Sequence, residues 1–177
     1  MTVRPQHRLR GHSGPRDLDV FPTNDARLGR ALFSKVAAAL EKGRPAPAAF
    51  VLHRERVDRF SLGGVANASA VTQKRVLAAM AGQEGVECVA VLGAFRFRGS
   101  GPMNGQWAAS VFIEWPDNRW WTAWQPIAPN RSLVGEGPQV RYAVDGSPRP
   151  GGVGGWFALS RRLGLKLRLH RSSTSVH

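Results

Sequence analysis

The segment "QWAASVFIEWPDNRWWTAWQPI", from Gln106 to Ile127, contains two apolar stretches separated by the turn-forming residues Pro116, Asp117 and Asn118. In the first stretch, every second residue is apolar: Trp107, Ala109, Val111, Ile113 and Trp115. Alternate residues of a strand share one face of a sheet. The pattern therefore predicts two antiparallel strands joined by a tight turn.

Further strands are predicted on both sides of this hairpin. The preceding stretch "VECVAVLGAFRFRG" is apolar at its start, and at its end Phe95 and Phe97 alternate with arginines. With the hairpin, it predicts a three-stranded antiparallel meander. The stretches "AFVL", "VDRFSL" and "QVRYAV" predict shorter strands.

Two helices are predicted in the first half of the chain. The first begins after "PTND", because Leu28, Leu32, Val36 and Leu40 then recur at helical spacing. The second runs from about Ser69, a suitable N-cap, to Ala81 before Gly82.

The C-terminal stretch "LGLKLRLH" carries a leucine at every second position from Leu163 to Leu169. A period of two favours a strand, with Lys166, Arg168 and His170 on the opposite face.

These elements predict an α+β fold, with a mainly antiparallel sheet covered on one face by two helices. We expect a basic flexible arm over residues 1–16 and one domain over residues 17–171. A Gly/Pro-rich loop region is expected within that domain over residues 130–156, and a polar tail over residues 172–177.

Positive charge is concentrated at the two ends of the chain. The formal net charge is +13; residues 1–16 contain four arginines, residues 146–177 contain six arginines and lysines, and neither segment contains an acid. Such acid-free flanks favour an anionic partner. The predicted nucleic-acid contacts are Arg4, Arg8, Arg10, Arg16, Arg96, Arg98, Arg119, Arg161, Arg162, Lys166, Arg168 and Arg171.

The tryptophans of "RWWTAWQPI" have two interpretations. Strand geometry places Trp120 and Trp124 on one face and Trp121 on the other. The rings either pack inside the protein, or Trp120, Trp121 and Trp124 form an aromatic platform beside arginines that holds single-stranded nucleic acid.

No catalytic or metal-binding motif is evident in the sequence. The single cysteine, Cys88, lies in an apolar run that is typical of a core residue. None of the five histidines has a second ligand at zinc-like spacing. His53, Glu55 and Asp58 form a His–acid cluster, which we interpret as a solvated strand end. The sequence thus predicts no metal site and no cofactor.

We expect a cytoplasmic, non-enzymatic protein whose basic ends bind DNA or RNA, as an accessory subunit of a larger assembly. The alternative is a protein–protein adaptor that docks through an exposed tryptophan patch and the C-terminal strand. A small hydrolase or transferase with a site assembled from distant residues is a further alternative. Neither a signal peptide pattern nor an apolar run of membrane-spanning length is present, so no membrane partner is expected.

Overall fold

A computed structural model describes residues 23–65, 68–97, 104–144 and 154–164. In this part of the chain the apolar runs form six strands and three α-helices. The strands are β1 (Ala48–His53), β2 (Val57–Ser61), β3 (Val86–Arg96), β4 (Trp107–Glu114), β5 (Trp120–Pro126) and β6 (Gln139–Ala143). The helices are α1 (Thr23–Ala39), α2 (Ala70–Ala81) and α3 (Trp156–Leu163), with short 3-10 turns η2 (Leu40–Lys42) and η3 (Gly63–Val65).

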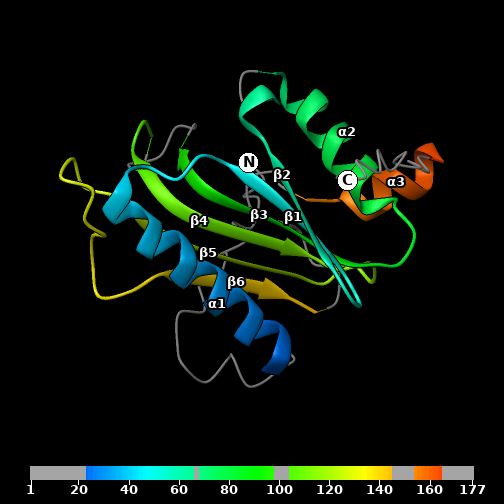
Figure 1. Cartoon of the computed structure of the whole chain (residues 1–177), viewed down its shortest axis with the longest axis horizontal. Coiled ribbons are helices and arrows are strands. Elements are labelled where there is room, and N and C mark those ends of the chain that lie inside the picture. The colour runs from blue at the N-terminus through cyan, green and yellow to red at the C-terminus, as the bar shows by residue number, and fades with distance from the viewer. Residues whose placement is uncertain (1–22, 66–67, 98–103, 145–153, 165–177) are drawn as a thin grey trace, which may run out of the picture.

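All six strands form one antiparallel sheet in the order β2-β1-β3-β4-β5-β6. The predicted meander is its centre, with Val111 opposite Leu92 on β3 and opposite Ala123 on β5. Strands β2 and β6 are the two edges (Figure 1). The expected α+β class with a mainly antiparallel sheet is therefore confirmed.

The helices differ from the prediction in number and placement. Alternation along β3 sends Cys88 and Ala90 into a core beneath α1, and Val89 and Val91 into a second core beneath α2 and α3. Figure 1 shows α2 and α3 side by side, away from α1. The strands of the meander are apolar on both sides, so each face of the sheet needs a cover.

Helix α1 packs closely on the meander because it carries a glycine where it meets the sheet. A Cβ atom on Gly29 would lie 2.6 Å from Cδ2 and Cε3 of Trp121. Trp121 is 1% exposed, so its ring lies wholly between the helix and the sheet. A Cα with no side chain allows this approach.

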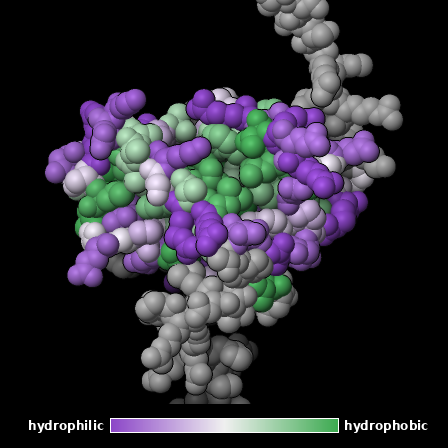
Figure 2. Space-filling view, turned by 60° about the horizontal axis from the view of Figure 1, so that its bottom comes forward, coloured by the Kyte–Doolittle hydropathy of each residue, from purple (hydrophilic) through white to green (hydrophobic). Residues whose placement is uncertain are grey.

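The core under α1 is not fully covered at β1 and β3. Phe50, Leu52 and Leu92 pack against it but are only half-buried. Figure 2 shows one view of the surface in which apolar side chains gather in the middle and hydrophilic side chains surround them.

Helix α2 has the N-terminus that the sequence predicts. The Ser69 hydroxyl accepts a hydrogen bond from the Thr72 amide at 3.2 Å, and Gly82 is the C-cap. Leu77, Ala78 and Ala81 form its buried side.

Helix α3 occupies a region for which we expected loop and then strand. Leu163, the first leucine of the expected C-terminal strand, is the last residue of α3, and Gly164 ends the helix in the left-handed conformation with φ 60°. The strand prediction is wrong at these two positions. The rest of that stretch, the predicted arm (1–16) and the predicted tail (172–177) lie outside the described residues.

Candidate functional site

A groove of about 520 Å³ lies between α2 and α3. It is lined by Val71, Lys74, Arg75, Gly155, Ala158, Leu159, Arg162 and Leu163. Cationic and apolar residues face it from both helices. The groove thus has an apolar part of its lining, which we call the floor, and a cationic part, which we call the rim.

Helical spacing explains why these residues line one groove. Lys74 and Arg75 follow Val71 by three and four positions on α2. On α3, Arg162 and Leu163 follow Leu159 by the same steps. Residues three and four apart are neighbours on one helical face, so each helix turns an apolar residue and at least one cation toward the other.

Part of the apolar lining of the groove is exposed to solvent. Val71 is 63% exposed and Leu163 is 46% exposed, while Leu159 is half-buried.

 Few large apolar side chains in the described part of the chain are this exposed: besides these two, Val57, Val134 and Val144. Two of the five therefore meet at this groove.

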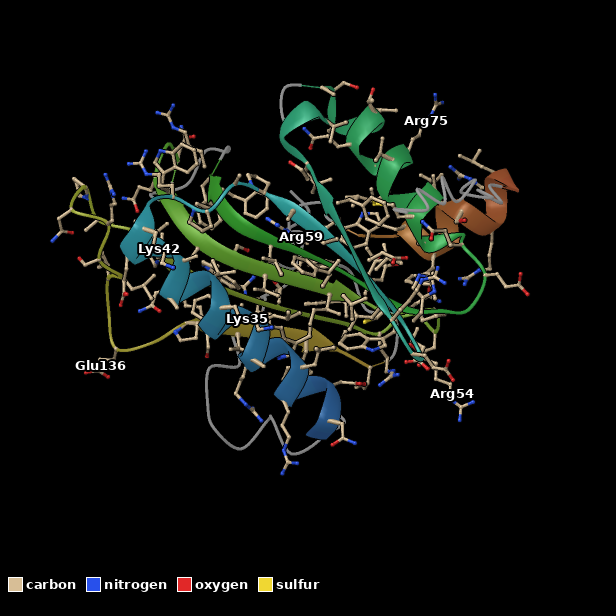
Figure 3. The ribbon with its side chains drawn as sticks, viewed as in Figure 1. Lys35, Lys42, Arg54, Arg59, Arg75 and Glu136 are labelled. Atoms are coloured by element: carbon tan, nitrogen blue, oxygen red, sulfur yellow. The ribbon has the colours of Figure 1, made fainter. Side chains whose placement is uncertain are left out.

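The charge of the groove is uniformly positive in the described structure. Neither α2 nor α3 contains an acid, and together they carry Lys74, Arg75, Arg161 and Arg162. Within the described residues, Lys74, Arg75 and Arg162 form no ion pair. Figure 3 shows Arg75 on α2, pointing away from the sheet. These three cations are available to an anionic ligand.

The position of α3 is fixed from beneath by the end of β4. Glu114 is 0% exposed, and its Oε2 accepts a hydrogen bond from the Trp156 amide at 3.2 Å. A carboxylate at a helix N-terminus is stabilised by the free N–H groups and by the helix dipole. On the outer side, Arg161 donates to the Pro116 carbonyl oxygen at 2.9 Å and to Asn118 Oδ1 at 3.4 Å. These contacts hold one wall of the groove against the sheet.

The structure brings together only some of the predicted cationic contacts. Arg162 lies in the groove with Lys74 and Arg75, which the sequence analysis did not select. Arg161 lies next to it but contacts the β4–β5 turn. Eight of the predicted contacts lie outside the described residues: Arg4, Arg8, Arg10 and Arg16 in the N-terminal flank, Arg98 after β3, and Lys166, Arg168 and Arg171 in the C-terminal flank.

The two other predicted arginines lie near opposite ends of β4 and serve local contacts. Arg96 is opposite Trp107, and its Nε donates to the Gly105 carbonyl oxygen at 2.9 Å. Arg119 follows the β4–β5 turn, where it pairs with Asp117 at 2.6 Å and with Asp25 of α1. Its guanidinium also lies 5.4 Å from the centre of the Trp115 ring. Arg119 therefore ties α1 to the turn.

Trp120, Trp121 and Trp124 do not form the exposed aromatic platform that was one of the two interpretations of the sequence. Trp120 and Trp121 point to opposite faces, as expected, but they are only 4% and 1% exposed. Trp120 stacks on Phe112 at 6.2 Å between ring centres, whereas Trp124 is half-buried with Arg141 at 5.2 Å from its ring centre. The rings are used mainly for packing, because the sheet has a core on each face.

The His–acid cluster in the first half of the chain is a local ion-pair network. His53 Nε2 lies 3.2 Å from Asp58 Oδ2, and Arg56 Nε donates to the same oxygen at 3.0 Å. Glu55 is exposed and forms no ion pair with another described residue. The network joins the end of β1 to the start of β2.

Within the described residues, no group of three or more His, Cys, Asp or Glu side chains could hold a metal ion. No helix in that part of the chain is long and apolar enough to cross a membrane.

Comparisons with protein-family models, with curated proteins and with solved structures found no match to this chain.

Proposed function

We propose that this chain is a non-enzymatic protein that binds an anionic polymer, DNA or RNA, through the α2–α3 groove and the basic segments at both ends. The observation that carries the proposal is the groove itself. Lys74, Arg75 and Arg162 line it without an ion pair to any described residue, and neither helix contains an acid.

Phosphate groups are the ligands that such a surface favours. Lysine and arginine side chains that contact phosphates release condensed counterions, and this release supplies affinity without regard to base sequence. The chain adds Lys166, Arg168 and Arg171 within nine residues after Arg162, so the cationic stretch of the sequence continues beyond the groove. Repeated phosphates along a polymer can engage more of these cations than one small anion can.

The proposal also places the protein in the cytoplasm, as an accessory subunit of a larger nucleoprotein assembly. The alternative of an adaptor that docks through exposed tryptophans has less support, because Trp120 and Trp121 are buried. The expected C-terminal docking strand begins inside α3 and otherwise lies outside the described residues.

A charge-matched pair of variants tests the proposal. One variant carries Lys74→Gln, Arg75→Gln and Arg162→Gln; the control carries Arg27→Gln, Arg30→Gln and Lys35→Gln on α1, where all three side chains are exposed. Binding to a short oligonucleotide is measured by fluorescence anisotropy over a series of salt concentrations.

The groove variant should bind more weakly, and the slope of log affinity against log salt should shrink by up to about 3 units. The control has the same net charge and should retain most of the wild-type slope. If both variants lose affinity equally, overall charge and not the groove determines binding. If the wild-type protein shows no salt-dependent binding, the proposed function is wrong.

A further inference from the structure

We infer that the α2–α3 groove is built for single-stranded nucleic acid, with bases against its apolar floor and phosphates at its cationic rim. This inference rests on the proposed function and adds the class of nucleic acid. It starts from a feature that phosphate binding alone does not explain, namely the exposed aliphatic side chains between the cations.

The exposed aliphatic residues are not scattered. Scattered apolar side chains are ordinary on a protein surface, but an apolar area with a polar border marks a binding site. Val71 and Leu163 are among the five most exposed large apolar residues of the described chain, yet they lie on different helices and line the same groove. Leu159 and Ala158 complete the floor between them.

A duplex does not match this surface. Its stacked bases are turned inward, and taking a base out of the stack costs a few kcal/mol. The duplex would place only its phosphates and sugars on the rim and would leave the floor exposed.

A single strand offers both kinds of contact along its length. Its bases have apolar faces that can leave water, while its phosphates remain at the side. Proteins that hold single strands combine a positive groove with apolar contacts to the bases, usually from aromatic rings. In this groove the aliphatic groups of Val71, Leu159 and Leu163 take that place, with Lys74 and Arg75 on one side and Arg162 on the other.

The size of the groove is compatible with this ligand. Its volume of about 520 Å³ lies within the range of about 300–1,000 Å³ over which protein sites bury drug-sized ligands. A nucleotide is a ligand of that size, so the groove can cover the base of at least one nucleotide while the rest of the strand lies outside it.

Three nucleic-acid probes of equal length separate the contribution of the bases to binding from that of the phosphates. They are an oligothymidine strand, an abasic strand with the same sugar-phosphate backbone, and a duplex. The floor variant carries Val71→Ser and Leu163→Ser; its control carries Val57→Ser and Val134→Ser, two exposed valines outside the groove. Circular dichroism and thermal unfolding establish that both variants remain folded.

The wild-type protein should bind oligothymidine about tenfold more tightly than the abasic strand, which corresponds to a base contact of ordinary strength. The floor variant should lose this preference without a change in the salt slope, since it removes no charge. The Val57→Ser, Val134→Ser control should keep both the preference for oligothymidine and the salt slope of the wild-type protein. Equal affinity for the first two strands in the wild-type protein would overturn the inference, as would a preference that survives in the floor variant.

Different binding results would contradict the proposed function and the single-strand inference. If all three probes bind alike, with salt-dependent affinity that the Lys74→Gln, Arg75→Gln, Arg162→Gln variant loses, the proposed function stands and the single-strand inference is wrong. If no probe binds but an acidic, leucine-containing peptide does, both are wrong and the groove belongs to a protein partner.

Discussion

Replacing Gly29 by alanine should destabilise the protein, although alanine is the better helix former. Gly29 lies in the middle of α1, where its backbone faces the ring of Trp121. A methyl group there would lie 2.6 Å from two carbons of the indole ring and 2.7 Å from a third, Cζ3. The ring is 1% exposed and lies between α1 and the sheet, so it cannot turn away without moving its neighbours.

Two effects of opposite sign determine how much Gly29→Ala changes the free energy of unfolding. A glycine-to-alanine change in a helix interior stabilises by about 1 kcal/mol. Adding a methyl group to a filled core costs about 1–3 kcal/mol, and three ring carbons within hard contact place this position at the upper end of that range. The difference is a net loss of about 2 kcal/mol. For a chain of this size, that loss lowers Tm by about 4–8 °C.

Urea unfolding followed by tryptophan fluorescence measures the change, with Ala38→Gly on the exposed side of α1 as the control for helix propensity. The control should lose about 1 kcal/mol. In a Trp121→Phe background the ring is smaller, so Gly29→Ala should cost much less than it does in the wild-type protein. A more stable Gly29→Ala protein would refute the close packing of α1 on Trp121.

Other regions of the fold give further predictions. Cys88 should not react with thiol reagents near neutral pH until the protein is unfolded, because burial raises its pKa from 9.0 to about 12; since the folded state favours the protonated thiol, its contribution to stability should decline as pH rises from about 9 to about 12. Glu114→Gln should lower the unfolding free energy by about 1–2 kcal/mol in urea titrations, because the Trp156 amide loses a charged acceptor at the helix N-terminus. An unchanged or higher stability would mean that burying the carboxylate costs as much as its hydrogen bonds contribute. Ser69→Ala should cost about 1 kcal/mol through loss of the Thr72 cap, whereas no loss would show that α2 begins elsewhere.

Local patterns were sufficient to predict most elements of this fold. The alternation in "QWAASVFIEW" predicts which side chains share a face of the sheet. Ser69 and Gly82 mark the two ends of α2, because they are its N-cap and C-cap residues. Helix α3 was missed because its eight residues follow a Gly/Pro-rich stretch and precede leucines spaced by two. Its N-terminus depends on Glu114, which lies 42 residues earlier, and no local pattern records such a contact.

The candidate site was predictable only in part, because it too depends on contacts between residues that are far apart in the sequence. Arg162 stands out in the sequence because it belongs to an acid-free flank. Lys74 and Arg75 lie in an ordinary amphipathic helix, and their importance follows from the packing of α2 on α3, which tertiary structure alone decides. The tryptophan cluster left two interpretations open, and the burial of Trp120 and Trp121 favours internal packing, because a sheet with two cores can bury rings on both faces.

The edge strand β2 carries charged side chains where a second copy of the chain could pair with it. The His53 amide donates to the Arg56 carbonyl oxygen, so in the antiparallel alternation Val57, Arg59 and Ser61 turn their backbone groups away from β1. Two copies that pair along the whole of β2 would set Arg59 against Arg59, a residue that Figure 3 shows on this strand. A slip of two residues in one direction would instead set Asp58 against Asp58, and in the other direction Phe60 against Phe60. Like charges directly opposite one another oppose pairing, so the strand is protected against edge-to-edge aggregation in the first two of these three registers.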